Sequence, residues 1–193
     1  NSLEITYNNI IQKKYNLNKN NEIIIIFIRG HVRNSFDNDN LYNLIKEIYN
    51  YFKNIHIYIS TFNIVQNNIS WRKLNEDNTI VDKSFIKNYF KDLYKLIKNI
   101  YIIDDKNINL IGNTEGKVCF SKAPLIGWKN YWYSKYYGLK NIYEKYENKS
   151  INIIHFRFDI MSNSFSFGIE EILNFINQNY NSNIYHNIFL KRY

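Results

Sequence analysis

Short apolar stretches recur along the chain, and each one ends in polar or charged residues. The apolar stretches occupy residues 23–28, 55–59, 100–103 and 151–156. The polar clusters that follow them are 29–33 (RGHVR), 60–62 (STF), 104–105 (DD) and 157–159 (RFD). Nearly continuous apolar runs of this length are typical of buried strands in a parallel sheet. Because open α/β sheets bind ligands beyond the carboxyl ends of their strands, we expect the four clusters to line one pocket.

Segments with apolar residues at helical spacing alternate with these stretches. The predicted helices cover residues 41–52, 85–97, 127–147 and 169–179. Asp37 or Asp39 can cap the first helix, and Asp82 or Ser84 can cap the second. This alternation favours an α/β fold with three layers, in which helices flank a mostly parallel sheet.

Two connections are longer than ordinary turns. Residues 65–78, which include Ser70, Trp71 and Arg72, and residues 107–124 both follow predicted strands. Loops of more than about 12 residues are usually functional or mobile, so we expect both to lie over the pocket. Residues 184–190 could supply a short closing strand. No linker or internal repeat divides the chain, which we interpret as one domain over residues 1–193, whether or not it belongs to a longer protein.

Composition limits the class of protein. The lone cysteine, Cys119, excludes an internal disulfide and a Cys-based zinc site, and it suits a reducing compartment. No apolar run approaches the roughly 20 residues that span a bilayer. We therefore expect a cytoplasmic protein without a transmembrane segment.

The formal net charge of +8 raises the question of a nucleic-acid partner. The lysines, however, are spread over predicted helix faces, as Lys87, Lys91 and Lys95 are, and no basic block or nucleic-acid motif occurs. We therefore expect no nucleic acid as a partner. A basic pocket for a phosphorylated small molecule would need only a few of these charges.

Several standard motifs are absent. The sequence contains no Walker A motif, no G-x-G-x-x-G after its first predicted strand and no H-E-x-x-H. These absences argue against P-loop NTPases, the usual dinucleotide dehydrogenases and common zinc hydrolases. Among the histidines, His31 follows Gly30 in the first polar cluster and is the candidate for a site. His56 and His155 lie inside predicted strands, where we expect a structural role.

The first and last polar clusters carry the clearest candidate chemistry. Gly30 permits a close backbone turn, and Arg33 has the planar fork that suits phosphate or carboxylate. Strand alternation places Arg157 and Asp159 on the same side. A carboxylate there could hold a divalent cation that bridges to a diphosphate, and the alternative is a structural Arg–Asp pair.

The start of the third predicted helix is rich in aromatic residues. Trp128 and Trp132 are four residues apart and share a face, for which core packing is the default interpretation. Lys129 and Tyr133 form a second pair on a neighbouring face, and this pair could reach a ligand.

Four short motifs follow one another in a set order: FIRGHVRNSF (27–36), IYISTF (57–62), WKNYWYSKYYGLKNIYEKYE (128–147) and IIHFRFDIM (153–161). In the same order, they resemble the SGQxR-x-F opening, the IFIHTW strand, the aromatic helix and the VIRxRxDxxF strand of a group of bacterial and large-DNA-virus glycosyltransferases. The resemblance covers about residues 23–161.

The resemblance implies a GT-A-like (Rossmann-like) fold that binds a nucleotide-diphospho-sugar. On that pattern, Gly30 and Arg33 line the nucleotide end and Thr61 flanks it. Asp159 stands where the family has its metal-binding acidic motif, and it would hold Mn²⁺ or Mg²⁺. In this chain the motif reads RFD instead of D-x-D. The predicted donor-binding set is completed by His31, Trp128, Lys129, Tyr133 and Arg157.

The implied activity is transfer of a sugar from this donor to a glycan, glycoprotein or other hydroxyl acceptor; a viral source would place it in the host cytoplasm. We expect Asp159, alone or with a metal ion, and Arg33 to offset charge on the departing diphosphate. In an inverting enzyme, a carboxylate would deprotonate the acceptor hydroxyl. Asp104, Asp105 and Glu170 are the candidates, although Asp104 and Asp105 could instead cap a loop.

Two other classes of protein are open alternatives. A non-catalytic nucleotide-sugar or glycan-binding module of the same fold is favoured by the missing second acidic residue and the short chain after Asp159, and turnover of a donor sugar would separate it from an enzyme. A basic RNA-binding domain would stack tyrosines on bases and bind less tightly as salt rises. It fits less well, because the aromatic residues fall at core-like helical spacing.

Overall fold

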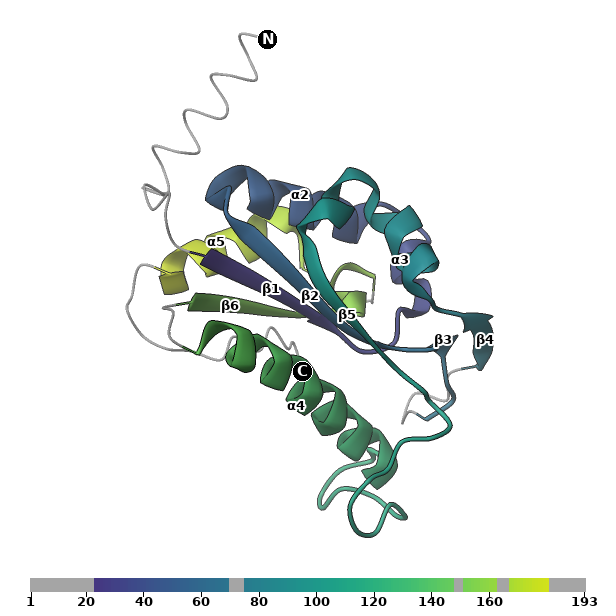
Figure 1. The fold of residues 1–193 in the computed structure, drawn as a ribbon. Coiled ribbons are helices and arrows are strands. Elements are labelled where there is room, and N and C mark those ends of the chain that lie inside the picture. Colours follow the sequence, from purple (N-terminus) through teal and green to yellow (C-terminus); the bar gives the residue numbers. More distant parts are fainter. Residues whose placement is uncertain (1–22, 70–74, 148–150, 163–166, 181–193) are drawn as a thin grey trace, which may run out of the picture.

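The central element of the fold is a four-stranded parallel sheet. The computed structural model describes residues 23–69, 75–147, 151–162 and 167–180. The strands lie in the order β5 (Ile97–Ile103), β2 (Ile55–Phe62), β1 (Ile23–Arg29) and β6 (Ile151–Arg157), and each neighbouring pair is parallel (Figure 1). Counted along the chain this is a 3-2-1-4 order, which is compatible with a Rossmann-like fold. The predicted parallel α/β sheet is therefore confirmed, while its GT-A-like character stays a prediction.

The sheet is covered by helices on both faces. Helices α2 (Asn40–Phe52), α3 (Lys83–Phe90) and α5 (Ile169–Tyr180) lie on one face, and α4 (Leu125–Tyr146) lies on the other (Figure 1). Parallel strands buried on both faces need no polar alternation, and six of the seven residues of β1 are buried. The predicted three layers are thus confirmed.

Two hydrophobic clusters fill the space between the layers. The larger one joins the strands to α2, α3 and α5 through fully buried residues such as Leu44, Ile86 and Ile172. The smaller one lies between the sheet and α4 and includes Phe27 and Ile142. The strand register across this core places Arg29 of β1 opposite Ser60 of β2 and Arg157 of β6, so the three strands end at one edge.

The helix caps were only partly predictable. The side chain of Asp82 accepts a hydrogen bond of 2.7 Å from the backbone N–H of Phe85, which confirms one of the two candidate caps of α3. Asp39 occupies the N-cap position of α2 without a side-chain capping bond, and its carboxylate instead pairs with Lys91.

The second predicted helix ends earlier than its apolar pattern indicates. Lys91 has a φ of 49°, which stops α3 at Phe90. The chain then forms a 3₁₀ segment, η2 (Lys91–Leu96), and β5 begins at Ile97 rather than at residue 100. Leu93 is still buried, so the apolar pattern identified the buried side but not the type of element.

The expectation that Trp128 and Trp132 of α4 pack in the core is wrong. Trp128 and Trp132 are 47% and 43% exposed. The face of α4 that is buried carries mostly small or polar residues, among them Asn130, Ser134 and Gly138. A Cβ atom on Gly138 would lie 2.3 Å from Cζ of Phe27, so the helix approaches β1 too closely for a side chain at this position.

The predicted loop at residues 65–78 contains regular structure. Strands β3 (Ile64–Gln66) and β4 (Asp77–Ile80) form a separate antiparallel pair there. The segment 70–72 within this loop and the predicted strand 184–190 lie outside the described residues. Two further 3₁₀ segments, η1 (Arg33–Phe36) and η3 (Phe158–Met161), follow β1 and β6. Among the described helices, none is both long and apolar enough to cross a membrane.

Candidate functional site

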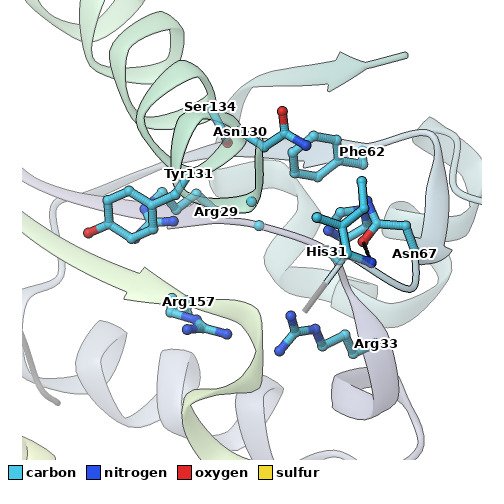
Figure 2. A pocket seen from close by; sticks show the side chains of 12 residues that line it. Arg29, His31, Arg33, Phe62, Asn67, Asn130, Tyr131, Ser134 and Arg157 are labelled. Carbon is cyan, nitrogen blue, oxygen red and sulfur yellow. Dashed lines mark hydrogen bonds between the residues drawn. The ribbon is translucent and has the colours of Figure 1, made fainter. Parts of the chain in front are cut away.

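A pocket of about 140 Å³ lies at the carboxyl edge of the sheet (Figure 2). Its walls come from the end of β1 and the turn after it, the end of β2, the segment after β3, the last residue of β6 and the start of α4. Strand β1 is where the strand order reverses, because β2 lies on one side of it and β6 on the other. Ligands of open α/β sheets bind at this kind of switch point, so the pocket is where the fold predicts a site.

Two arginines share one carboxylate oxygen at the edge of the pocket. Nη1 of Arg33 and Nη2 of Arg157 donate to Oδ2 of Asp159 at 2.7 and 2.6 Å. The Asp159 side chain is only 7% exposed, whereas those of Arg33 and Arg157 are 21% and 51% exposed. Both guanidinium groups line the pocket and point toward one another in Figure 2. Two positive charges thus flank a single buried negative charge.

The backbone after β1 bends sharply to bring Arg33 to this place. Gly30 has a φ of 99°, a conformation that glycine adopts without steric penalty. Arg33 itself has a φ of 53°, which is uncommon for a residue with a side chain. Thr61 stabilises this turn, because its buried hydroxyl donates to the Gly30 carbonyl at 2.9 Å.

Arg29 adds a third positive charge to the pocket wall. Its side chain is buried, its Nε donates to Nε2 of His155 at 2.7 Å, and its guanidinium lies 3.6 Å from the centre of the Tyr131 ring. Burial lowers the pKa of Arg29 to about 10, so the group is still charged at neutral pH. The donation from Arg29 requires Nε2 of His155 to be an acceptor, and burial lowers the pKa of His155 to about 3. The structural role expected for His155 is therefore observed.

The α4 wall of the pocket carries a buried acceptor. Oδ1 of Asn130 is buried and has no hydrogen-bond partner among the described residues. A buried acceptor left unpaired is unfavourable by about 1–3 kcal/mol. Asn130 lies on the opposite side of the pocket from Arg33 and Arg157 (Figure 2). Because this oxygen has almost no accessible surface, a ligand hydroxyl reaches it only if the Asn130 side chain rotates.

His31, in the turn after β1, forms a hydrogen-bonded pair with Asp105. Nε2 of His31 lies 3.0 Å from Oδ1 of Asp105, and the imidazole stacks on Phe62 with ring centres 4.0 Å apart. The same Asp105 oxygen accepts from Nδ2 of Asn67 at 2.9 Å, and the Asp105 backbone N–H donates to the side chain of Asn63. Burial lowers the pKa of His31, although the hydrogen bond to Asp105 opposes this shift.

The structure brings together six of the predicted site residues. They are Gly30, His31, Arg33, Arg157, Asp159 and Asp105. Asp104 is exposed and caps the loop after β5, because its carboxylate accepts from the Lys106 backbone and the Asn107 side chain. Those hydrogen bonds, the one from Asn107 first, hold the pKa of Asp104 below its usual value.

The remaining predicted residues lie apart from the pocket lining. The ammonium of Lys129 donates to the backbone carbonyl of Ile111, and Trp128 is exposed. Tyr133 packs against Tyr137 with ring centres 4.5 Å apart. Glu170 is in the first turn of α5.

Sequence reasoning missed the part of the pocket that α4 contributes. Gly127, Asn130, Tyr131 and Ser134 recur at helical spacing and form a mostly polar stripe. This spacing can be seen in the sequence, but the large aromatic residues of the neighbouring face favoured a different interpretation of the helix. Arg29 lines the pocket, as expected of the first polar cluster, but the sequence analysis gave it no individual role.

The donor set around Asp159 does not favour a divalent cation. A cation at Oδ2 would meet the guanidinium groups of Arg33 and Arg157 at hydrogen-bonding distance. Across residues 23–69, 75–147, 151–162 and 167–180, no group of three or more His, Cys, Asp or Glu side chains could hold a metal ion. The predicted Mn²⁺ or Mg²⁺ stays a prediction from the resemblance.

Comparison with known proteins gives no match to a family model, to a curated protein or to a solved structure. The chain is assigned to no family. The resemblance to glycosyltransferases stays a prediction.

Proposed function

We propose that the pocket binds the diphosphate of a nucleotide-diphospho-sugar and that the protein is a glycosyltransferase acting on a hydroxyl acceptor. The observation that carries the proposal is the convergence of Arg29, Arg33 and Arg157 on a pocket at the switch point of the sheet. Planar guanidinium groups bind phosphate oxygens through paired hydrogen bonds. Three of them in one small pocket suit a ligand with more than one negative charge.

In this proposal, the arginines offset the charge that develops on the departing diphosphate. Electrostatic stabilisation of this kind is usually the largest single contribution to catalysis. Asp159 acts as a positioning residue, because it holds Arg33 and Arg157 in fixed orientations from a buried place. It could bind a divalent cation only if the guanidinium groups moved away, so we expect diphosphate binding to occur without Mn²⁺ or Mg²⁺.

The other side of the pocket suits the sugar or ribose part of the donor. Asn130 lines this side, and its amide is a group that can form hydrogen bonds with sugar hydroxyls. The guanidinium of Arg29 lies over the ring of Tyr131, so the α4 side of the pocket contacts one of the three arginines.

A thermal-shift screen tests the binding part of the proposal. Pyrophosphate, UDP, GDP, CDP and ADP are each added with EDTA or with Mn²⁺, and UMP serves as the monophosphate comparison. A ligand at 100 times its dissociation constant adds about 2.7 kcal/mol of stability. We expect pyrophosphate and at least one nucleoside diphosphate to stabilise the protein in EDTA, more than UMP does. The absence of a shift with every diphosphate would contradict the proposal.

The observation that favours a second candidate is the engagement of Asp159 by two arginines. A donor-binding fold without a carboxylate for metal or catalysis would serve as a non-catalytic binding module. Release of a nucleoside diphosphate from sugar nucleotides separates the two candidates. The enzyme releases it continuously, whereas the module binds the donor and leaves it intact.

A further inference from the structure

We infer that His31 is the general base of the proposed transferase and that Asp105 is the residue that positions it. This inference rests on the proposed function. The imidazole of His31 lines the same pocket as Arg33 and Arg157, and its Nε2 atom is 3.0 Å from Oδ1 of Asp105. A base and a diphosphate-binding group in one pocket are what a direct displacement at a sugar carbon requires.

The contacts of Asp105 determine which nitrogen of His31 carries the proton. An ionised carboxylate only accepts hydrogen bonds, and the Asp105 oxygen already accepts from Nδ2 of Asn67 at 2.9 Å. Nε2 of His31 must therefore be the protonated nitrogen in the neutral ring. Nδ1 then keeps its lone pair and is the atom that takes a proton from an acceptor hydroxyl.

The ring is held in place before a ligand arrives. Phe62 stacks on one face of the imidazole at an interplanar angle of 8°. Asp105 is itself fixed by Asn63, whose side-chain oxygen accepts from the Asp105 backbone N–H at 2.9 Å. A base fixed in this way loses little conformational freedom when the acceptor binds, which favours catalysis.

The charges that face His31 suit a base at neutral pH. Asp105 in the turn after β5 raises the pKa of His31, while Arg33 of η1 and Arg157 of β6 lower it, and burial lowers it most. The free protein therefore presents a neutral imidazole. A bound diphosphate offsets the two arginines, so uptake of a proton by His31 becomes more favourable once the donor is in the pocket.

The proposed step balances as a single displacement. The acceptor hydroxyl gives its proton to Nδ1 of His31, and its oxygen forms a bond to the anomeric carbon. The bond from that carbon to the diphosphate oxygen breaks, and the electron pair leaves with the diphosphate, whose charge Arg33 and Arg157 offset. A single displacement inverts the anomeric configuration. Water in place of the acceptor gives slow hydrolysis of the donor.

The test uses the full chain as wild type, His31→Gln and Asp105→Asn, with His56→Gln as the control. The amide of His31→Gln can still donate to Asp105 but cannot accept a proton at neutral pH. His56 is near the start of β2, in contact with Tyr146 and outside the pocket lining. A panel of UDP-, GDP-, CDP- and ADP-sugars is incubated with each protein, and released nucleoside diphosphate is measured against pH.

We expect wild type and His56→Gln to release nucleoside diphosphate with similar kcat. His31→Gln should lower kcat by about 100-fold or more, with binding of pyrophosphate changed by less than about threefold. Asp105→Asn should lower kcat and shift the pH profile. In ¹⁵N spectra it should move the proton of neutral His31 from Nε2 to Nδ1, because the new amide can donate to Nε2.

The outcomes separate this inference from the proposed function. An active wild type with an equally active His31→Gln variant overturns the inference alone. Loss of pyrophosphate binding in His31→Gln also overturns it, because His31 would then be a binding residue. A wild type that releases nothing from any sugar nucleotide overturns the proposed transfer, and the inference with it. If His31→Gln does not fold, the ¹⁵N spectrum of the wild type decides, since a proton on Nδ1 of neutral His31 excludes the base.

Discussion

Arg33 and Arg157 donate to the same oxygen of Asp159, at 2.7 and 2.6 Å, from segments at opposite ends of the described chain. The parallel pairing of β1 with β6 makes this possible, because it brings the turn after β1 beside the end of β6. The sharing of one acceptor orients two cations toward a pocket instead of neutralising each with its own carboxylate. This relationship is the basis of the binding proposal and of the first two predictions.

Removal of either pocket arginine should weaken diphosphate binding. A hydrogen bond between charged groups contributes about 1.5–3 kcal/mol, so Arg33→Gln or Arg157→Gln should raise the dissociation constant of pyrophosphate by roughly 10- to 100-fold. Isothermal titration calorimetry in EDTA measures this change. Lys140→Gln is the matched control, since Lys140 is exposed on α4 and paired only loosely with Glu144 at 3.8 Å. Equal affinity in all three variants would rule out the arginines as the binding groups.

Substitution of Asp159 should separate binding from catalysis. Asp159→Ala removes the shared acceptor of the two guanidinium groups, so they lose their fixed orientation but keep their charge. We expect Asp159→Ala to keep measurable pyrophosphate binding without metal and to lose most donor turnover. Full turnover by this variant would contradict the positioning role. A different result would place a metal ion at Asp159. In that result, pyrophosphate does not bind without metal, and Mn²⁺ restores its binding to the wild type but not to Asp159→Ala.

Acid should destabilise the protein through His155. The pKa of this residue is about 3 in the folded state, while an unfolded histidine has a pKa of 6.5. Below the unfolded value, the unfolded state binds more protons, so stability present above about pH 6.5 is lost progressively as pH falls toward 3. Between pH 6.5 and 5 this loss is about 2 kcal/mol.

His155→Gln isolates this contribution, because the amide oxygen can still accept from Nε of Arg29. Urea unfolding at pH 7 and pH 5 gives the free energy of unfolding of each protein. The variant should lose less stability on acidification than the wild type, by about 2 kcal/mol. Identical losses would show that His155 is protonated in the folded state near its ordinary pKa.

Gly138→Ala should destabilise the fold. Alanine normally favours a helix interior by about 1 kcal/mol over glycine. Here the new methyl would lie 2.3 Å from the fully buried ring of Phe27, so we expect a net loss of about 1–3 kcal/mol. Gly168→Ala is the control, because its Cβ would meet no atom within 4 Å. A higher melting temperature for Gly138→Ala than for wild type would show that α4 does not pack this closely on the sheet.

The fold could be predicted because its strands are short, mostly apolar and followed by polar residues. The four predicted strands and the helix at residues 169–179 agree with the structure to within a few residues. The end of α3 could not be predicted, because Lys91 adopts a positive φ without a glycine or proline to signal it.

The site could be predicted only in part, since it depends on which segments pair in space. The clusters that begin at Arg29 and Arg157 follow strands and were found. The partnership of His31 with Asp105 was not, because it requires β5 to lie beside β2 rather than at the other edge of the sheet. On α4, Trp128 and Trp132 indicated the wrong buried face, because the helix packs closely on the sheet at Gly138 and buries Asn130 and Ser134 instead.

The most direct test of the central claim is a titration of the wild type with pyrophosphate in EDTA, followed in ¹H–¹⁵N spectra of the arginine Nε–H groups. Pyrophosphate is the part that all the proposed donors share. The variants Arg33→Lys and Arg157→Lys assign the two resonances, because each variant lacks one of them. Our account predicts that the resonances of Arg33 and Arg157 move together and saturate at one dissociation constant. Resonances that stay in place at saturating pyrophosphate would contradict it.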